Sequence, residues 1–210
     1  MGCDSSNTLD NMRKSSKIPQ EVSMGKHVLV FKGSPREKGN SSILAEKAAE
    51  GAKAAGAEVE SFTLHNMYIR PCDACDICQE TGVCVLMDDM QTLYPNLRGA
   101  EAIVIASPIY WFTISAQTKL FIDRWYALES TQGNALKGKQ FGIILTYGDT
   151  DPYSSGAINA IRTFQDMMRY LGADIRGIVY GTASNEGDVL SQPKLMERAY
   201  LLGQKLGGSS

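Results

Sequence analysis

The sequence lacks any apolar run approaching the ~18–20 residues of a membrane-spanning helix. Its first 24 residues also lack the apolar core of a secretory signal. A large excess of charge of one sign is also missing. The formal net charge is −2 over 210 residues, which gives no sequence-independent attraction to nucleic acid or to an anionic membrane. These absences predict a cytoplasmic protein that binds neither nucleic acid nor membranes.

Histidine is rare, and the common nucleotide-binding patterns are missing. The two histidines, His27 and His65, fall at the start and the end of predicted strands, and neither has an identifiable partner, so we assign them no role. The loop after the first predicted strand is neither a G-x-G-x-x-G pattern nor a Walker loop. No protein nucleophile or general base is evident.

Cysteine is also scarce, yet four of the five cysteines are crowded together. Cys72, Cys75, Cys78 and Cys84 follow a C-x2-C-x2-C-x5-C spacing. Cysteines this close in sequence usually belong to one site. In a reducing compartment they more often bind metal or do chemistry than form structural disulfides. The spacing alone leaves open an iron–sulfur cluster, a zinc ion, a disulfide pair or no ligand.

Strand-like and helix-like segments alternate from Lys26 onward. Short continuous apolar runs are typical of strands buried on both faces of a parallel sheet. Five such strands alternating with helices predict one α/β three-layer domain over residues 25–207, with a cysteine-rich insertion at about 65–90. The predicted strands are 27–31, 58–64, 101–106, 139–146 and 174–180, and the predicted helices are 41–55, 88–97, 115–128, 158–171 and 193–206.

Residues 1–24 are rich in Ser, Asn and Lys and predict a disordered tail or extension. The first six residues, Met-Gly-Cys-Asp-Ser-Ser, match the N-myristoylation pattern, and Cys3 is available for palmitoylation. We interpret the segment as a disordered extension, or as the result of a start site placed upstream of Met24.

The loop after the first predicted strand has the composition of a phosphate site. In a doubly wound sheet, ligands bind beyond the carboxyl ends of the strands. Ser34, Asn40 and Ser41 offer hydroxyl and amide donors, and Arg36 adds a fixed cation. The N-terminus of the following helix attracts an anion. An ordinary turn with Asn40 or Ser41 as the N-cap is the alternative.

Two further loops follow the third and fourth predicted strands. Residues 107–113 hold three adjacent aromatics, Tyr110, Trp111 and Phe112. Exposed aromatics flanking a cleft suit a planar ring system, although a hydrophobic cap or a subunit interface is the alternative. In residues 146–151, Gly148 stands among polar residues and allows a close approach of the backbone to a ligand.

Together these residues resemble the NADPH-dependent FMN reductase group of flavodoxin-like proteins. The resemblance rests on residues 28–36 and 39–41, and on residues 108–112 followed by 116–119. The cysteine spacing, placed after the second strand and before Asp88-Asp89-Met90, resembles the iron–sulfur flavoproteins of that group. The resemblance to this group covers about residues 26–205 and implies a flavodoxin-like fold, with a five-stranded parallel sheet of order 2-1-3-4-5.

The resemblance also implies two cofactors and the residues that hold them. It implies a [4Fe–4S] cluster on Cys72, Cys75, Cys78 and Cys84, whose short spacers suit a compact cubane. The implied FMN-binding residues are Ser34, Arg36, Asn40 and Ser41 at the phosphate, Pro108, Ile109, Tyr110 and Trp111 along the ring and ribityl chain, and Tyr147 and Gly148 at the far side of the ring.

Asp88 and Asp89 admit two interpretations. Paired carboxylates can serve as catalytic acids. They also suit the N-cap and first turn of the helix that follows, where negative charge is stabilising, and we favour this structural role.

The function that these features predict is an FMN-dependent oxidoreductase with a cluster that exchanges electrons with the flavin. NAD(P)H or ferredoxin would be the electron donor, and a small molecule or a protein would be the acceptor. The resemblance further implies a homodimer or homotetramer. The alternatives are a cluster-free NAD(P)H-dependent FMN, quinone, azo or nitro reductase, and a non-enzymatic flavin- or zinc-binding module.

Overall fold

The computed structural model describes residues 25–130 and 133–208. The tail expected over residues 1–24, with its acylation pattern, lies outside them. The strands are β1 (His27–Lys32), β2 (Glu58–Thr63), β3 (Ala102–Tyr110), β4 (Thr113–Ile114), β5 (Glu129–Ser130), β6 (Gly133–Asn134), β7 (Gln140–Tyr147) and β8 (Asp174–Thr182). The α-helices are α1 (Asn40–Ala54), α2 (Ile77–Thr81), α3 (Met90–Gly99), α4 (Ala116–Asp123), α5 (Ala157–Leu171) and α6 (Pro193–Gly207), and the 3₁₀ helices are η1 (Leu64–Asn66), η2 (Arg124–Leu128) and η3 (Asp188–Ser191).

The main sheet confirms the predicted fold. Its parallel strands run in the order β2-β1-β3-β7-β8, which is the flavodoxin-like order 2-1-3-4-5. The central strands are continuous apolar runs because both of their faces are covered. The carboxyl ends of all five strands therefore meet at one edge of the sheet.

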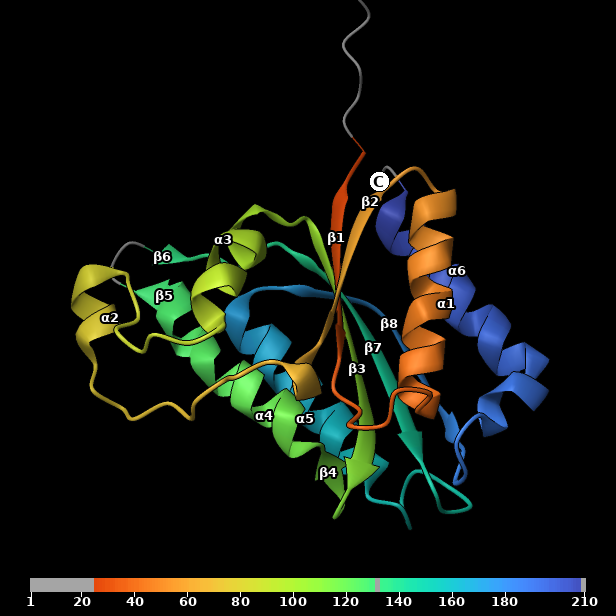
Figure 1. Cartoon of the computed structure of the whole chain (residues 1–210). Coiled ribbons are helices and arrows are strands. Elements are labelled where there is room, and N and C mark those ends of the chain that lie inside the picture. The colour runs from red at the N-terminus through yellow and green to blue at the C-terminus, as the bar shows by residue number, and fades with distance from the viewer. Residues whose placement is uncertain (1–24, 131–132, 209–210) are drawn as a thin grey trace, which may run out of the picture.

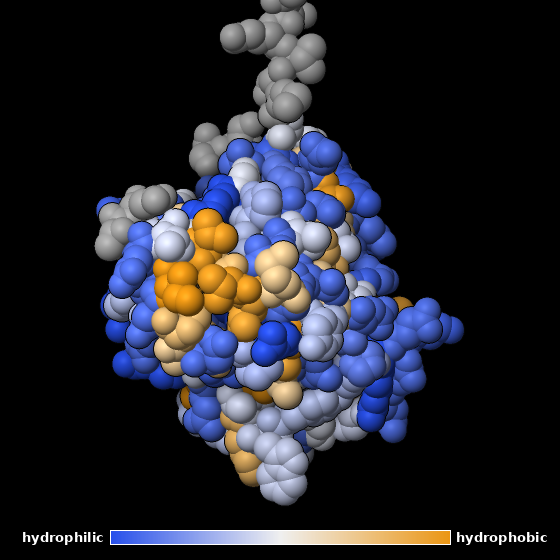
Figure 2. Space-filling view, turned by 60° about the vertical axis from the view of Figure 1, so that its left-hand side comes forward, coloured by the Kyte–Doolittle hydropathy of each residue, from blue (hydrophilic) through white to orange (hydrophobic). Residues whose placement is uncertain are grey.

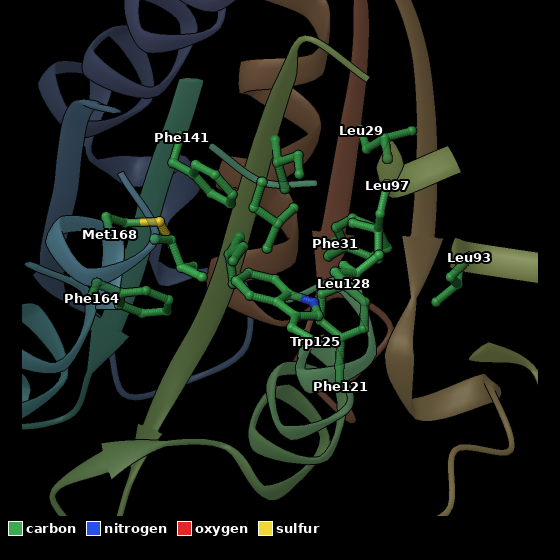
Figure 3. Close-up of a cluster of buried hydrophobic side chains, with 14 of the residues drawn as sticks. Leu29, Phe31, Leu93, Leu97, Phe121, Trp125, Leu128, Phe141, Phe164 and Met168 are labelled. Atoms are coloured by element: carbon green, nitrogen blue, oxygen red, sulfur yellow. The ribbon is translucent and has the colours of Figure 1, made fainter. Parts of the chain in front are cut away.

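Helices cover both faces of the sheet (Figure 1). α1 and α6 lie together on one face, and α3, α4 and α5 lie on the other. Figure 3 shows the core of the second face, where Phe31 and Phe121 pack with ring centroids 4.3 Å apart. The rings of Trp125 and Phe121 pack edge to face, with centroids 5.4 Å apart.

Among the helices of the described residues, none combines the length and the apolarity that a membrane crossing requires.

Several local differences separate this fold from the predicted elements. The expected loop 107–113 is a hairpin, because β3 runs on to Tyr110 and β4 returns beside it. The expected helix 115–128 divides into α4 and η2, and the carbonyl of Arg124 at the division accepts a hydrogen bond from the Tyr94 hydroxyl at 3.2 Å. The small β5–β6 hairpin was not predicted.

The contact between α1 and α6 depends on glycine. A Cβ at Gly203 would lie 1.8 Å from the carbonyl oxygen of Ala48, and backbone atoms leave no room for it. We expect Gly203→Ala to lower the free energy of unfolding by about 3 kcal/mol, measured by chemical denaturation, because the two helices must separate. Gly99, at the end of α3, has nothing within 4 Å of its Cβ position. Gly99→Ala should be neutral or stabilising by up to about 1 kcal/mol. Equal losses in both variants would contradict close packing at Gly203.

Candidate functional site

A cavity of about 250 Å³ lies at the carboxyl edge of the sheet. The loops after the first, third and fourth parallel strands meet there, as predicted. Nine of the ten residues predicted to hold FMN line this cavity, and Trp111 is the exception. The structure therefore brings the predicted residues together, while their contacts with FMN stay a prediction.

The N-terminus of α1 faces this cavity. The Ser34 hydroxyl accepts a hydrogen bond from the Arg36 amide at 3.1 Å, which shapes the loop before the helix. The first N–H groups of an α-helix have no partner within the helix. Ser41 is 1% exposed, and its Oγ has no hydrogen-bond partner among the described residues. Buried hydroxyls are normally satisfied, so an orphan at a helix N-terminus fits an anionic oxygen such as the FMN phosphate.

The side chain of Asn40, a predicted FMN-binding residue that lines the cavity, is engaged with the loop after β8. Its side-chain amide donates to the carbonyls of Ala183 and Asn185 at 3.2 and 2.7 Å. Its Oδ1 accepts from the Val189 amide at 3.3 Å. The side chain thus ties the loop after β8 to the start of α1. Ala183 and Ser184 of that loop line the cavity, and sequence reasoning missed them. Their signal was present, because residues 183–187 are a polar loop at the same edge.

A second cavity of about 330 Å³ adjoins the first and shares Ile109, Tyr147 and Gly148 with it. Trp111 and Phe112 line this second cavity. They form the tip of the β3–β4 hairpin, with φ of 46° and 66°. Left-handed backbone at two bulky residues is costly and suits a two-residue hairpin turn. Trp111 is 92% exposed, so it is not a hydrophobic cap over the sheet within this chain.

The cysteine segment projects from the α3 side of the domain (Figure 1). Cys72 and Cys75 are exposed, Cys84 is partly buried and Cys78, on α2, is buried. Ala74 and Asp76 between them adopt left-handed backbone, with φ of 54° and 58°. Within residues 25–130 and 133–208, no three cysteine, histidine or acidic side chains are gathered where one metal ion could bind them.

The thiols of Cys78 and Cys84 differ in their surroundings. Burial raises the pKa of Cys78, and the neighbouring thiols of Cys84, Cys75 and Cys72 raise it further. Burial also raises the pKa of Cys84, but hydrogen bonds from the Leu86 backbone, from Tyr94 and from Arg124 outweigh it and leave that pKa lowered. Cys84 is therefore suited to the thiolate form that ligates metals.

Asp88 and Asp89 close the base of the cysteine segment. The Arg70 amide donates to Asp88 Oδ2 at 2.9 Å, and the Tyr68 amide donates to Asp89 Oδ2 at 2.7 Å. Asp88 Oδ1 accepts from the Met90 amide at 3.1 Å at the start of α3, whereas Asp89 occupies the N-cap position without a capping hydrogen bond from its side chain. Sequence reasoning missed the larger role of Asp88, which is an ion pair with Arg124.

Both side chains of that ion pair are buried, with 1% exposure for Arg124 and 0% for Asp88. Burial raises the pKa of Asp88, but hydrogen bonds from Arg124 and from the Arg70 backbone leave it lowered. Arg124 Nη2 also donates to Cys84 Sγ at 3.3 Å. A carboxylate, a guanidinium and a thiol therefore form one buried polar group beside the cysteine segment.

The donor set of this segment fits an iron–sulfur cluster in its chemistry, since four thiols share one short stretch and one of them is stabilised as a thiolate. The thiols are not gathered at metal-binding distance. Apolar side chains cover the outer face of the segment, where Val83, Val85 and Met87 are exposed. Figure 2 shows apolar residues gathered on this side of the molecule.

Comparisons with known proteins agree with this geometry. Residues 27–180 match the family described as NADPH-dependent FMN reductase. An iron–sulfur flavoprotein of Methanosarcina thermophila is 33% identical over 161 residues, covering 77% of this chain and 80% of its own. A Bacillus subtilis protein named as an NAD(P)H-dependent FMN-containing oxidoreductase is 30% identical over 177 residues, covering 82% and 93%.

The fold is also shared with solved structures. An NAD(P)H:quinone oxidoreductase from Methanothermobacter marburgensis superposes with a TM-score of 0.71 at 20% identity, covering 89% of this chain and 98% of its own.

Proposed function

Since this chain belongs to the NADPH-dependent FMN reductase family and is an FMN-dependent oxidoreductase, we propose that it binds FMN in the cavity at the N-terminus of α1 and holds a [4Fe–4S] cluster on its cysteine segment. The observation that carries the flavin site is the buried Ser41 hydroxyl, which has no hydrogen-bond partner in the part of the chain that the structure describes. Family membership sets aside the alternative of a non-enzymatic binding module.

Bound FMN supplies hydride and single-electron transfer, and the protein supplies position and electrostatics. Ser41, Arg36 and the first amides of α1 would hold the phosphate. Pro108, Ile109 and Tyr110 would lie along one side of the ring and ribityl chain. Tyr147 and Gly148 would lie along the other.

The adjoining cavity is proposed to receive the molecule that exchanges electrons with the flavin. It opens beside Ile109, Tyr147 and Gly148, which it shares with the proposed FMN cavity. The exposed Trp111 and Phe112 at its rim offer flat apolar surfaces for a nicotinamide or an aromatic acceptor. NAD(P)H is the donor that the family description supports, and ferredoxin is the donor expected if the cluster takes up electrons from a protein.

The observations that bear on the cluster favour two different candidates. The four cysteines, the lowered pKa of Cys84 and the name of the Methanosarcina relative support a cluster. A Bacillus relative named only for FMN favours a cluster-free reductase as the second candidate. A homo-oligomer stays a proposal, supported by the exposed apolar face over Val83, Val85 and Met87, and light scattering measures it.

Anaerobic purification tests both candidates in one preparation. We expect a yellow protein with flavin absorption bands, and a brown shoulder with iron and sulfide near four per chain. A yellow protein without iron that oxidises NAD(P)H with quinones would favour the cluster-free reductase. A colourless protein that takes up no FMN on titration would refute the flavin site.

Ser41→Ala is expected to weaken FMN binding about tenfold, because one hydrogen bond to a charged phosphate contributes about 1.5 kcal/mol. The stability of the apoprotein should not fall, since Ser41 Oγ has no partner within the described chain. Fluorescence titration of apoprotein with FMN and chemical denaturation measure the two effects. Ser191→Ala, which removes a hydroxyl from η3 outside the cavity, is the control. Wild-type affinity in Ser41→Ala would contradict the proposed contact.

A further inference from the structure

Arg124 is the largest fully buried side chain of the described residues, and it begins η2 beside the cysteine segment. Its guanidinium makes three kinds of contact. Nη1 pairs with Asp88 and donates to the Arg70 carbonyl at 2.9 Å. Nη2 donates to Cys84 Sγ at 3.3 Å. An arginine stays protonated in proteins, so this is a permanent buried cation aimed at a sulfur.

Packing alone does not account for this arrangement. Removing two charges from water is costly, and apolar residues of similar size often serve stability as well or better. The Nε of Arg124 is buried and has no hydrogen-bond partner in the described parts of the chain. Asp88 and the Arg70 carbonyl hold Nη1 of the guanidinium. Nη2 then points to the Cys84 sulfur and donates to it. The buried polar group formed by Asp88 and Arg124 therefore presents a charged donor to the Cys84 sulfur.

A second arginine lies near the same cysteine without this contact. Arg98 and Cys84 line one cavity of about 260 Å³. Arg98 is exposed, and its Nη2 donates to the carbonyls of Gly82 and Ala127 at 3.2 and 3.3 Å. The chain thus offers a matched pair: a buried arginine that donates to the sulfur, and an exposed one that only neighbours it.

We propose that Arg124 is a positioning residue that donates a charged hydrogen bond to the Cys84 sulfur and raises the reduction potential of a cluster ligated by Cys84. A donor and a positive charge at a ligand sulfur stabilise the more negative, reduced cluster, because both oppose the charge that reduction adds. This inference rests on the cluster proposed above, and it assigns to Arg124 and Asp88 a role beyond the four ligands.

The test compares midpoint potentials in wild type, Arg124→Lys, Arg124→Gln and Arg98→Gln. Each protein is reconstituted anaerobically with FMN, iron and sulfide, and titrated with redox mediators while its spectrum is recorded. We expect a lower cluster potential in Arg124→Gln, which loses the charge, and a smaller decrease in Arg124→Lys, which keeps the charge but not the planar donor. Arg98→Gln should match wild type. The FMN potential in the same titration should stay constant and serves as the internal reference.

The outcomes separate the two proposals. A yellow wild type that takes up no cluster would overturn the cluster and this inference together, and would leave the flavin site standing. A wild type with a cluster, and Arg124 variants with the wild-type potential, would overturn this inference alone. An equal decrease in Arg98→Gln would also overturn it, because the effect would then be general surface charge. If Arg124→Gln loses its fold by circular dichroism, Arg124→Lys decides by the same comparison.

Discussion

Replacing Asn40 by alanine is expected to weaken FMN binding by at least tenfold and to lower the free energy of unfolding by about 2–4 kcal/mol. The side chain makes three hydrogen bonds, to the backbone of Ala183, Asn185 and Val189. Asn40 is 7% exposed, so its loss leaves buried backbone groups without partners. The loop after β8, which forms one wall of the proposed FMN cavity, would then detach from the N-terminus of α1.

Chemical denaturation of the apoprotein and FMN titration followed by flavin fluorescence measure the two effects. Asn96→Ala is the matched control, because its side chain makes one exposed hydrogen bond, to Glu60 on β2. It should change stability by less than about 0.5 kcal/mol and leave the FMN affinity alone. A loss of stability in Asn40→Ala with wild-type FMN affinity would show that the loop after β8 does not shape the cavity.

The fold was predictable because local signals agree with the global arrangement. The buried strands are short apolar runs, and the glycines that end α1 and α5, Gly56 and Gly172, both have positive φ. Parallel strands with helical connections then allow few topologies. The meeting of the three loops at one cavity follows from this order, because the carboxyl ends of parallel strands share one edge.

Side-chain partners were harder to predict, because they depend on contacts distant in sequence. Asn40 suggested a phosphate donor or an N-cap, yet its partners lie more than 140 residues away. Arg124 lay within a predicted helix, and its pairing with Asp88 spans 36 positions. Hydrophobic periodicity reports which face of an element is buried, and it says nothing of which charge meets which. The hairpin at Trp111 was missed for a related reason: bulky residues rarely adopt positive φ.

Asp88→Ala is expected to lower the free energy of unfolding by about 3–5 kcal/mol, because it leaves the Arg124 guanidinium buried and uncompensated. The change also removes the acceptor for the Arg70 and Met90 amides, so the base of the cysteine segment opens. Chemical denaturation measures the effect. Asp89→Ala is the neighbouring control: its carboxylate accepts only the exposed Tyr68 hydrogen bond among its described contacts, and its loss should cost under about 1 kcal/mol.

A double variant separates the cost of a stranded charge from the loss of the pair itself. Asp88→Leu with Arg124→Met removes both charges and keeps apolar volume, so it should be more stable than Asp88→Ala by several kcal/mol, on the order of 2–4. Greater stability in the double variant would mean that the pair is not retained for folding. Its presence beside Cys84 would then require a functional reason, and the donation of Arg124 to the sulfur supplies one. A double variant as unstable as Asp88→Ala would instead assign the pair to the fold, through the backbone of residues 68–70 that it holds.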